Sequence, residues 1–484
     1  MVLKDIIKDL KVLRTEGPLN IDIDAIAYDS RQVTPRSLFF CIDGYQKDGH
    51  DFAIKAVNKG ANAVVLTKNI VLPDYVVKVF VDNPRRAMGL AATNFYGKPT
   101  EDLMLLGVTG TNGKTTTTYL IKSILDQAGI RTGLIGTIKN IVGEEDIPSI
   151  RTTPEPLVLH KMFRDMVSQD IKAVVMEVSS HSLELDKVAG CRFETAVFTN
   201  LTRDHLDFHG NFENYYAAKK KLFKLSRTGI VNLDDESGRR ILEDLDGKNY
   251  TYGIDNNADI YASDIDIRSQ DTLFKLFLPD HTSADITMQT PGLFSVYNGL
   301  AAASACHSVG LPIADIKKGL ELIRGVPGRF ELLDTGTDYS VIIDYAHTPD
   351  GLRNILTTAR ELADGRLIIL FGCGGDRDWS KREIMGQIAG EYSDYCIVTS
   401  DNPRGEEPME IIEQIVPGVI ASKCHYKVIE DRKEAIAFAL SSSRKDDILI
   451  LAGKGHETYQ VLRDKTINFD EKEIVAELLG REQV

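Results

Sequence analysis

The 484-residue chain has no long apolar run free of charged residues, so the sequence predicts no membrane-spanning helix. Its first residues, MVLKDIIKDLKVL, lack the apolar core and small-residue cleavage site of a secretory signal peptide. The net charge of -14 argues against nucleic acid or an anionic membrane as the main partner, although a local basic pocket can still bind a small anion. We therefore expect a cytoplasmic protein without membrane insertion.

Paired cysteine motifs are also missing. The six cysteines are widely scattered, with no CxxC pair and no histidine at metal-ligand spacing. We expect reduced, mostly buried thiols. The chain also has no fixed-period repeat and no low-complexity segment.

Apolar runs of strand length alternate with helical patterns, which favours α/β architecture. We predict three domains: a smaller N-terminal α/β domain over residues 1–97, a central P-loop-type ATPase domain with a mostly parallel sheet over 98–328, and a doubly wound α/β domain over 329–484. Strands are expected at SLFFCI, ANAVVLT and YVVKVFV in the first domain and at SVIIDY, RLIILFG, DYCIVTS and DILILAG in the last. Within the central domain, ADIYASDIDI, TLFKLFL and ADITMQT indicate a local antiparallel insert.

The strongest local signal is GVTGTNGKTTTTYLIKSIL, in which a strand runs through a glycine turn into a helix. Five residues separate Gly107 from Gly113 instead of the usual four, and Gly110 supplies flexibility within the loop. Backbone N–H groups at such a turn hold phosphate oxygens, Lys114 neutralises charge and Thr115 can ligate Mg²⁺. The alternative is a glycine turn before an ordinary helix. The predicted ATP-binding residues here are Gly110, Thr111, Asn112, Gly113, Lys114, Thr115 and Thr116.

Two further apolar strands end in polar side chains. KAVVMEVSSHSLEL ends its strand at Glu177, and ETAVFTNLTRDHLDFHG delivers Asp204 and His205. A carboxylate and an imidazole beside a phosphate loop predict a Mg²⁺ site, although His205 alone would more often cap or pack. The following lysine run, 219–221, is typical of a solvated helix face.

The letters DNPR occur twice, at Asp82 to Arg85 and at Asp401 to Arg404. In the first copy Asp82 or Asn83 can cap a helix and Pro84 suits its first turn, so we interpret this copy as helix punctuation followed by a solvated face.

Several ordered motifs resemble the Mur ligases, ATP-dependent enzymes that form amide bonds in peptidoglycan synthesis. They are TGTNGKTT, MEVSSHSL, FTNLTRDHLDFHG with AAK, GRFE, DYAHTPD and GCGGDRD. The resemblance extends from DSRQVTPRSLFF near Asp29 to AGKGHE at Gly453. It implies that ATP converts a carboxylate into an acyl phosphate, which an amine then attacks, and that Mg²⁺ is needed. The implied catalytic residues are Lys114, Glu177, His205 and Lys219, and the implied metal ligands are Thr115, Glu177, His205 and Lys219, with Lys219 carbamylated to N6-carboxylysine.

The resemblance also implies substrate contacts. Further ATP contacts are Asn298, Arg329, Asp344 and His347. The UDP-N-acetylmuramoyl-L-alanyl-D-glutamate contacts are Ser30, Tyr45, Gln46, Thr152, Thr153, Ser179, Leu185 and Lys187. Many relatives have Gln and Arg where this chain has Leu185 and Lys187, and a lysine lacks the bidentate fork of arginine.

Four loops of the last domain follow apolar strands and should meet at one sheet edge. Arg404 can pair with the distal carboxylate of meso-diaminopimelate, while Asp401 and Glu457 can hold its ammonium. The expected contacts are Arg377, Asp401, Asn402, Pro403, Arg404, Gly453 and Glu457. Together with these loops, the resemblance implies a Mur ligase that adds meso-diaminopimelate, and we expect a monomer. The alternatives are addition of L-lysine, a folylpolyglutamate-synthetase-like ligase, or a non-catalytic nucleotide-binding regulator.

Overall fold

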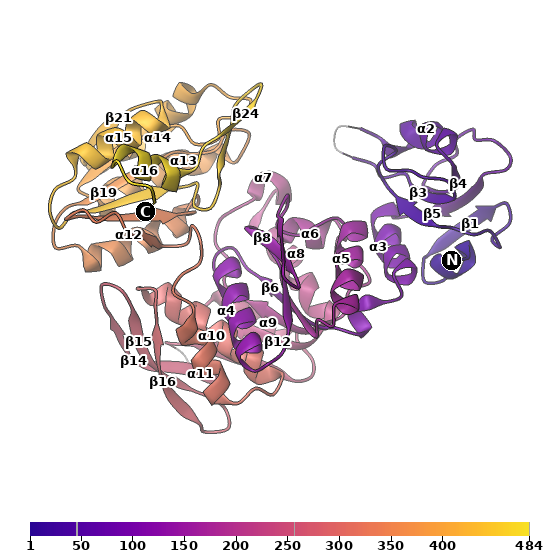
Figure 1. Cartoon of the computed structure of the whole chain (residues 1–484), viewed down its shortest axis with the longest axis horizontal. Helices are drawn as coiled ribbons and strands as arrows, with labels where there is room; N and C mark the ends of the chain where they lie inside the picture. Colours follow the sequence, from indigo (N-terminus) through magenta and orange to yellow (C-terminus); the bar gives the residue numbers. More distant parts are fainter. Residues whose placement is uncertain (45–46, 256, 484) are drawn as a thin grey trace. The chain divides into compact units, whose positions relative to one another are not determined.

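The computed structural model describes residues 1–44, 47–255 and 257–483. They divide into two compact units. The first comprises residues 1–109, 129–197 and 218–229, and the second comprises 110–128, 198–217 and the described chain from Ile230 onward. Their strands form three α/β sheets and a two-stranded ribbon (Figure 1). Among the described residues, no helix is long and apolar enough to cross a bilayer.

The N-terminal sheet has the strand order β1-β5-β4-β3-β2. Strand β1 is antiparallel to β5, and the other neighbours are parallel. The three strands expected in this segment are confirmed as β3, β4 and β5. The bounds are β1 (Val12–Glu16), β2 (Ala25–Ala27), β3 (Ser37–Phe40), β4 (Ala61–Leu66) and β5 (Val77–Val81).

Helix α3 (Pro84–Phe95) begins where the first DNPR copy predicts. The Asn83 side chain accepts a hydrogen bond from the backbone N–H of Arg86 at 3.0 Å, and Pro84 occupies the first turn. Arg86 is exposed, as expected of a solvated face. The same expectation is wrong for Arg85, which is half-buried and lines a cavity.

The central sheet has eleven strands in the order β16-β15-β14-β13-β12-β11-β6-β10-β7-β8-β9. Strand β10 is parallel to both β6 and β7. The bounds are β6 (Met104–Thr109), β7 (Thr132–Ile135), β8 (Lys139–Val142), β9 (Glu145–Pro148), β10 (Ala173–Glu177), β11 (Phe193–Phe198), β12 (Ser226–Asn232), β13 (Asn249–Gly253), β14 (Ile260–Ile267), β15 (Thr272–Phe277) and β16 (Ser283–Met288).

The three strands predicted as an antiparallel insert are β14, β15 and β16, and they pair antiparallel. They do not form a separate local sheet, because β14 also pairs in parallel with β13 and continues the central sheet. The central helices are α4 (Lys114–Gln127), α5 (Pro156–Ser168), α6 (Ser180–Glu184), α7 (Leu206–His209), α8 (Phe212–Lys220), α9 (Glu236–Glu243), α10 (Leu293–Ser308) and α11 (Ile313–Leu322).

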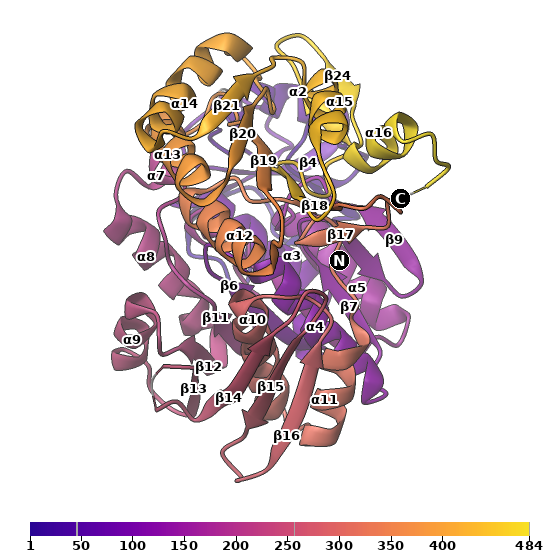
Figure 2. The same cartoon turned by 90° about the vertical axis from the view of Figure 1, so that its left-hand side faces the viewer.

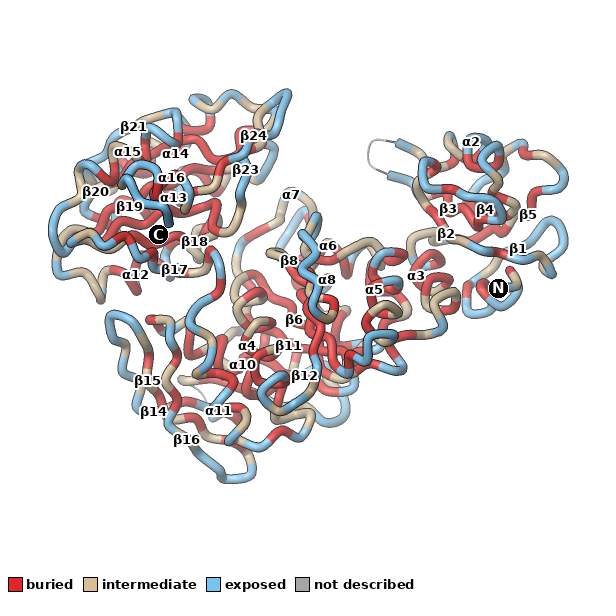
Figure 3. The backbone as a smooth tube through the Cα atoms, viewed as in Figure 1, coloured by how far each residue is buried: buried red, intermediate tan, exposed pale blue. Residues whose placement is uncertain are grey.

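The C-terminal sheet has the order β17-β18-β22-β19-β20-β21 and is parallel apart from β17. All four strands expected here are present, and they are largely buried (Figure 3). The strand bounds are β17 (Glu331–Leu333), β18 (Ser340–Asp344), β19 (Leu367–Phe371), β20 (Tyr395–Val398), β21 (His425–Val428) and β22 (Ile448–Ala452).

Helices cover both faces of this sheet (Figure 2), which confirms the doubly wound prediction. One apolar core joins the sheet to α12 (Pro349–Leu362), α13 (Arg382–Tyr392) and α14 (Pro408–Ser422). The other joins it to α15 (Arg432–Ser442) and α16 (Glu471–Leu478). The domain boundaries at residues 97 and 328 stay predictions.

Candidate active site

The glycine turn between β6 and α4 is held by the chain that follows β11. The Thr111 N–H donates to the Asn200 carbonyl at 2.8 Å, and the Asn112 N–H donates to the Asn200 side chain at 2.9 Å. Thr199 Oγ1 donates to the Asn112 carbonyl at 2.6 Å. Gly113 has a φ of +83°, a left-handed conformation that suits glycine. The turn is therefore fixed by its neighbours and leads directly into the N-terminus of α4, where backbone N–H groups favour an anion.

Lys114 is the first residue of α4, and its ammonium donates to the carbonyls of Gly110 at 3.0 Å and Thr111 at 2.8 Å. The cation is thus positioned over the turn. The next residue, Thr115, accepts a hydrogen bond from Arg329 Nη2 at 3.0 Å. The structure therefore brings together a lysine, an arginine and a helix N-terminus, an arrangement suited to a polyphosphate.

Arg329 has a buried hydrogen-bond donor that no described residue satisfies. Its guanidinium carbon lies 4.6 Å from the centre of the Tyr345 ring, and its buried Nε has no hydrogen-bond partner among the described residues. An unsatisfied buried donor is costly unless a ligand or water pairs with it. The cation and the orphaned donor fit an anionic nucleotide.

Three other predicted ATP contacts lie in the same unit. Asn298 of α10 accepts a hydrogen bond from Thr117 Oγ1 at 3.4 Å. Thr117 lies in α4, one helical turn after Gly113. Asp344 ends β18 and accepts hydrogen bonds from the N–H groups of Phe330 and Ala346, both at 2.6 Å; burial raises its pKa. His347 follows it; burial together with the charge of Lys381 lowers its pKa to about 4, so the ring is neutral at pH 7. Thr116 is the third residue of α4, and its role stays a prediction.

His205 and Asp204 face each other in the second unit. His205 has a left-handed φ of +54°, and its Nε2 lies 3.3 Å from a carboxylate oxygen of Asp204. Burial alone would raise the pKa of Asp204, but the nearby groups of His205, His347 and Lys381 outweigh it and lower that pKa to about 2. Asp204 therefore stays ionised at neutral pH, near the charge of Lys381.

Glu177 ends β10 in the first unit and is buried. Its two carboxylate oxygens accept hydrogen bonds from Thr137, one from the N–H at 2.8 Å and one from Oγ1 at 2.9 Å. Thr152 Oγ1 lies 3.1 Å from Thr137 Oγ1, and Thr153 Oγ1 donates to the Glu177 carbonyl at 2.9 Å. The Ser179 N–H donates to Thr153 Oγ1 at 3.2 Å. The structure thus groups all four predicted residues, while Thr137, in a polar turn without a recognisable motif, was missed.

The three lysines at the end of α8 and just after it differ in burial. Lys219 is only 2% exposed, whereas Lys220 and Lys221 are partly exposed. A lysine inside a protein is costly as a charged ammonium. The solvated-face interpretation is therefore wrong for Lys219 and holds for its two neighbours.

Two of the four C-terminal loops, SDNPRG and AGKGHE, meet at a lysine that the sequence interpretation overlooked. Lys454 is fully buried, and its ammonium lies 3.2 Å from Asn402 Oδ1, 3.4 Å from a Glu457 carboxylate oxygen and 3.7 Å from Asp401. Asn402 in turn donates to Glu457 at 2.8 Å. A side chain at Gly453 would come within 2.8 Å of the Asp401 carboxylate, so this position requires glycine.

Two arginines stand beside this network. Arg404 donates to the carbonyls of Gly375 at 2.9 Å and Asn402 at 3.4 Å. Burial lowers the pKa of Arg404, and the positive charge of Arg377 acts in the same direction. Pro403 links Asn402 to Arg404 in the same loop. Two neighbouring guanidinium groups favour a carboxylate ligand.

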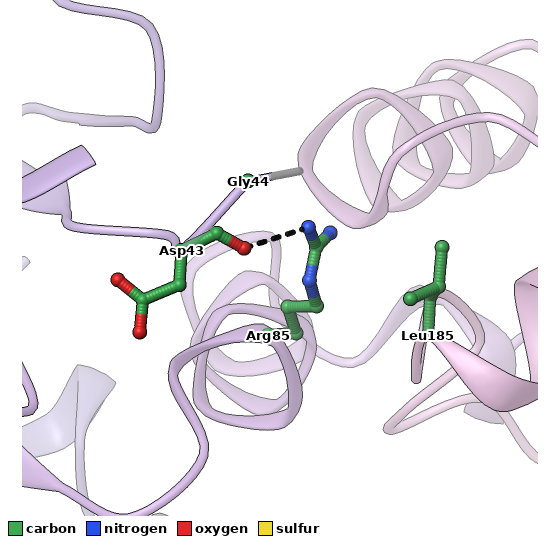
Figure 4. Close-up of a pocket in the computed structure, with 4 residues that line it drawn as sticks. All are labelled: Asp43, Gly44, Arg85 and Leu185. Atoms are coloured by element: carbon green, nitrogen blue, oxygen red, sulfur yellow. Dashed lines mark hydrogen bonds between the residues drawn. The ribbon is translucent and has the colours of Figure 1, made fainter. Parts of the chain in front are cut away.

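The predicted UDP-sugar residues lie in the first unit, except that Tyr45 and Gln46 fall outside the described residues. Ser30 is buried. Leu185 lines a cavity with Asp43, Gly44 and Arg85 (Figure 4). Lys187 is not among the residues that line this cavity. Its ammonium pairs with the Glu155 carboxylate at 2.8 Å.

Comparison with known proteins agrees with these features. Residues 22–96 match a model of the Mur ligase family catalytic domain, residues 108–306 match the Mur ligase middle domain, and residues 328–455 match the Mur ligase glutamate ligase domain. The chain belongs to the Mur ligase family.

Other Mur ligases resemble it over their whole length. A UDP-N-acetylmuramoyl-L-alanyl-D-glutamate--2,6-diaminopimelate ligase 1 of Clostridium acetobutylicum is 51% identical over 485 residues, covering 99% of each chain. A ligase of the same activity from Clostridium tetani is 48% identical, again over 99% of each chain.

Solved Mur ligase structures share the fold. A structure of a UDP-N-acetylmuramoyl-L-alanyl-D-glutamate--2,6-diaminopimelate ligase has a TM-score of 0.70 at 30% identity and covers 99% of both chains. MurF of Thermotoga maritima in complex with ADP has a TM-score of 0.63 at 20% identity, covering 88% of this chain and 93% of its own. The folylpolyglutamate synthase of Mycobacterium tuberculosis has a TM-score of 0.65 at 15% identity, covering 83% and 96%. The last two support the fold alone.

Proposed function

We propose that the chain is the ATP-dependent ligase that joins meso-diaminopimelate to the D-glutamate carboxylate of UDP-N-acetylmuramoyl-L-alanyl-D-glutamate in peptidoglycan precursor synthesis. The observation that carries this proposal is the 51% identity, over 99% of both chains, to a ligase named for that reaction. The arginine pair Arg377 and Arg404 supports the choice of amino acid, because L-lysine has no distal carboxylate to pair with them.

The reaction needs an activated carboxylate. An oxygen of the D-glutamate carboxylate attacks the γ-phosphorus of ATP, the bond to the β-phosphate oxygen breaks and ADP leaves. The amine of diaminopimelate then attacks the acyl carbon, loses a proton and expels phosphate. Lys114 and Arg329 would stabilise the negative charge that gathers during phosphoryl transfer.

We further propose that Mg²⁺ binds at Thr115, Glu177, His205 and a carbamylated Lys219. The hydroxyl and carboxylate oxygens of this set are of the type that Mg²⁺ prefers, and carbamylation would add another carboxylate-like group. When bound, Mg²⁺ would neutralise phosphate charge during transfer. The burial of Lys219 supports the modification, because burial favours the neutral amine, the form that adds carbon dioxide, and the carbamate anion that results would be compensated by Mg²⁺.

The test is an assay of the purified protein with ATP, Mg²⁺ and UDP-N-acetylmuramoyl-L-alanyl-D-glutamate, offered meso-diaminopimelate, L-lysine or no amine. We expect ADP release and a product of the corresponding mass with diaminopimelate. Preference for L-lysine would refute the amino-acid assignment. Absence of amine-dependent ADP release with both would refute the ligase itself, and a parallel reaction with a folate and glutamate distinguishes the folylpolyglutamate-type alternative.

Cytoplasmic location and a monomeric state complete the proposal. All six cysteines are free thiols and five are buried, as suits a reducing compartment. Light scattering of the eluting protein tests the monomer, since a mass of twice 53.7 kDa would contradict it.

A further inference from the structure

A cavity of about 270 Å³ lies in the first unit, and Asp43, Gly44, Arg85 and Leu185 line it (Figure 4). Arg85 comes from the first turn of α3, and Leu185 follows α6. Sites for drug-sized ligands are usually about 300 to 1,000 Å³, so this cavity suits one portion of a larger ligand.

The Arg85 guanidinium is held in place but lacks a counter-ion. Its Nη2 donates to the Asp43 carbonyl at 3.2 Å. Figure 4 shows the Asp43 carboxylate turned away from Arg85, and that carboxylate lies 3.3 Å from His50 Nδ1 instead. No carboxylate of the described residues forms an ion pair with Arg85, so its positive charge is uncompensated.

The neighbouring cations are already paired. Arg86 lies 3.7 Å from Asp186, while Lys187 and Arg151 share Glu155 at 2.8 Å and 2.6 Å. Burial lowers the pKa of Lys187, and the positive charges of Arg151 and Arg85 lower it further. Arg85 is therefore close enough to Lys187 and Arg151 to add to the positive potential around them. This local excess of positive charge stands out in a chain of net charge -14.

We propose that Arg85 binds the diphosphate of the UDP-sugar substrate, with Leu185 as an apolar wall of the same subsite. This inference rests on the proposed function for the identity of the ligand. The planar guanidinium has five N–H donors, and the bond to Asp43 uses one of them. Its remaining donors match phosphate oxygens in a way that the ammonium of Lys187, held by Glu155, does not.

A matched set of ligands and variants tests the assignment. Calorimetric titration of uridine, UMP and UDP into wild type, Arg85→Gln and Arg86→Gln separates the nucleoside from its phosphates. We expect Arg85→Gln to weaken UDP binding by about tenfold, the loss of one charge-assisted hydrogen bond, while uridine binding changes little. Glutamine can still donate to the Asp43 carbonyl, and Arg86→Gln should behave as wild type.

Two results would overturn the proposal. An equal loss of affinity for all three ligands would mean that Arg85 stabilises the Asp43 loop and does not bind phosphate. Unchanged UDP binding by Arg85→Gln, or no UDP binding by the wild type, would exclude Arg85 from a diphosphate subsite. Arg85→Lys, which keeps the charge, should retain part of the UDP affinity. A thermal midpoint for each variant separates binding from misfolding.

Kinetics gives an independent measure. For Arg85→Gln we expect the KM for UDP-N-acetylmuramoyl-L-alanyl-D-glutamate to rise by about tenfold, with the KM values for ATP and diaminopimelate unchanged. A uniform rise in all three KM values contradicts the assignment. If the wild type has no ligase activity, the proposed function fails, and the nucleotide titration still decides the role of Arg85.

Discussion

Arg404 adopts a left-handed backbone conformation, with φ of +50°, which is uncommon for a residue with a side chain. Its N–H donates to the Val461 carbonyl at 3.1 Å, so the loop conformation is fixed by a neighbouring segment. We predict that Arg404→Ala raises the KM for meso-diaminopimelate by about tenfold to a hundredfold, because a charge-assisted pair with the distal carboxylate is lost.

Steady-state kinetics with each substrate varied in turn measures this effect. Arg360→Ala is a control from the same sheet domain, since Arg360 forms a partly exposed pair with Asp394. A KM for ATP that rises as much as the KM for diaminopimelate would mean that Arg404 stabilises the loop and does not bind the amino-acid substrate.

Lys219 is the buried member of a three-lysine run. We predict that Lys219→Ala lowers kcat by about a hundredfold or more, as expected when a group of the catalytic cluster is lost. Added short carboxylates such as acetate should partly restore the rate if the side chain is carbamylated. Native mass spectrometry at neutral pH should show one added carbon dioxide on the wild type that Lys219→Ala lacks.

The neighbouring half-exposed lysine provides the control for this prediction. Lys220→Ala should keep its rate and gain nothing from carboxylates. Full activity of Lys219→Ala would exclude the residue from the site, and loss without rescue would argue for an unmodified lysine.

At the residue scale, the sequence was informative where a residue stands in a recognisable motif. Lys114 was predicted from the glycine turn that leads into a helix and Glu177 from the end of an apolar strand, and the structure has Lys114 as the first residue of α4 and Glu177 as the last residue of β10. Lys454 was not predicted to matter, although its loop and that of Asn402 were expected to meet, because nothing in the sequence shows that its side chain is buried and reaches Asn402. Arg85 was misjudged because its hydrogen-bond partner Asp43 belongs to a segment distant in sequence.

At the scale of elements, the side chain of Asn83, the N-cap of α3, makes two hydrogen bonds. Asn83 accepts from the Arg86 N–H, and its side-chain amide donates to Asp186 at 2.8 Å. We predict that Asn83→Ala lowers the free energy of unfolding by about 1 kcal/mol, as the loss of a helix cap does. Asn83→Ser, which can still cap, should lose less.

Urea unfolding followed by circular dichroism measures both variants. Asp82→Ala is the matched control, because Asp82 is exposed and the cap belongs to its neighbour. Equal stability of Asn83→Ala and wild type would show that the cap contributes nothing to α3.

Element types were predictable where the apolar pattern was strong. The buried runs of β3, β4, β19 and β22 gave strands in the expected places. The hairpin of β8 and β9 was not predicted, because every residue of β9 is exposed and the strand therefore has no apolar pattern. Pairing was harder to predict than strand type, since the β13–β14 pairing that extends the central sheet leaves no local signal.

For the whole molecule, three histidines predict acid sensitivity: His160, which is buried, and His347 and His456, which are half-buried. Burial lowers the pKa values of His160, His347 and His456 to about 4 each, below the usual value of about 6.5. Between these values the unfolded chain binds more protons than the folded one. Stability is therefore complete above about pH 6.5 and falls as the pH drops toward 4, by up to about 1.4 kcal/mol per pH unit for each histidine.

Urea unfolding at a series of pH values from 7.5 to about 4.5 checks this slope. His160→Gln should show a shallower pH dependence than wild type, whereas His425→Gln, at an exposed position, should match the wild type. An unchanged slope in His160→Gln would show that this histidine does not titrate differently in the folded and unfolded chains.

The loop cluster around Lys454 also bears on how such an enzyme can change its substrate in evolution. Three cations, Arg377, Arg404 and Lys454, stand with two carboxylates, Asp401 and Glu457, so the cluster carries a surplus of one positive charge. The distal end of diaminopimelate is zwitterionic, whereas that of lysine is a bare cation. Replacing Arg404 removes one positive charge from this cluster, so a single substitution takes away a group that would repel the lysine ammonium.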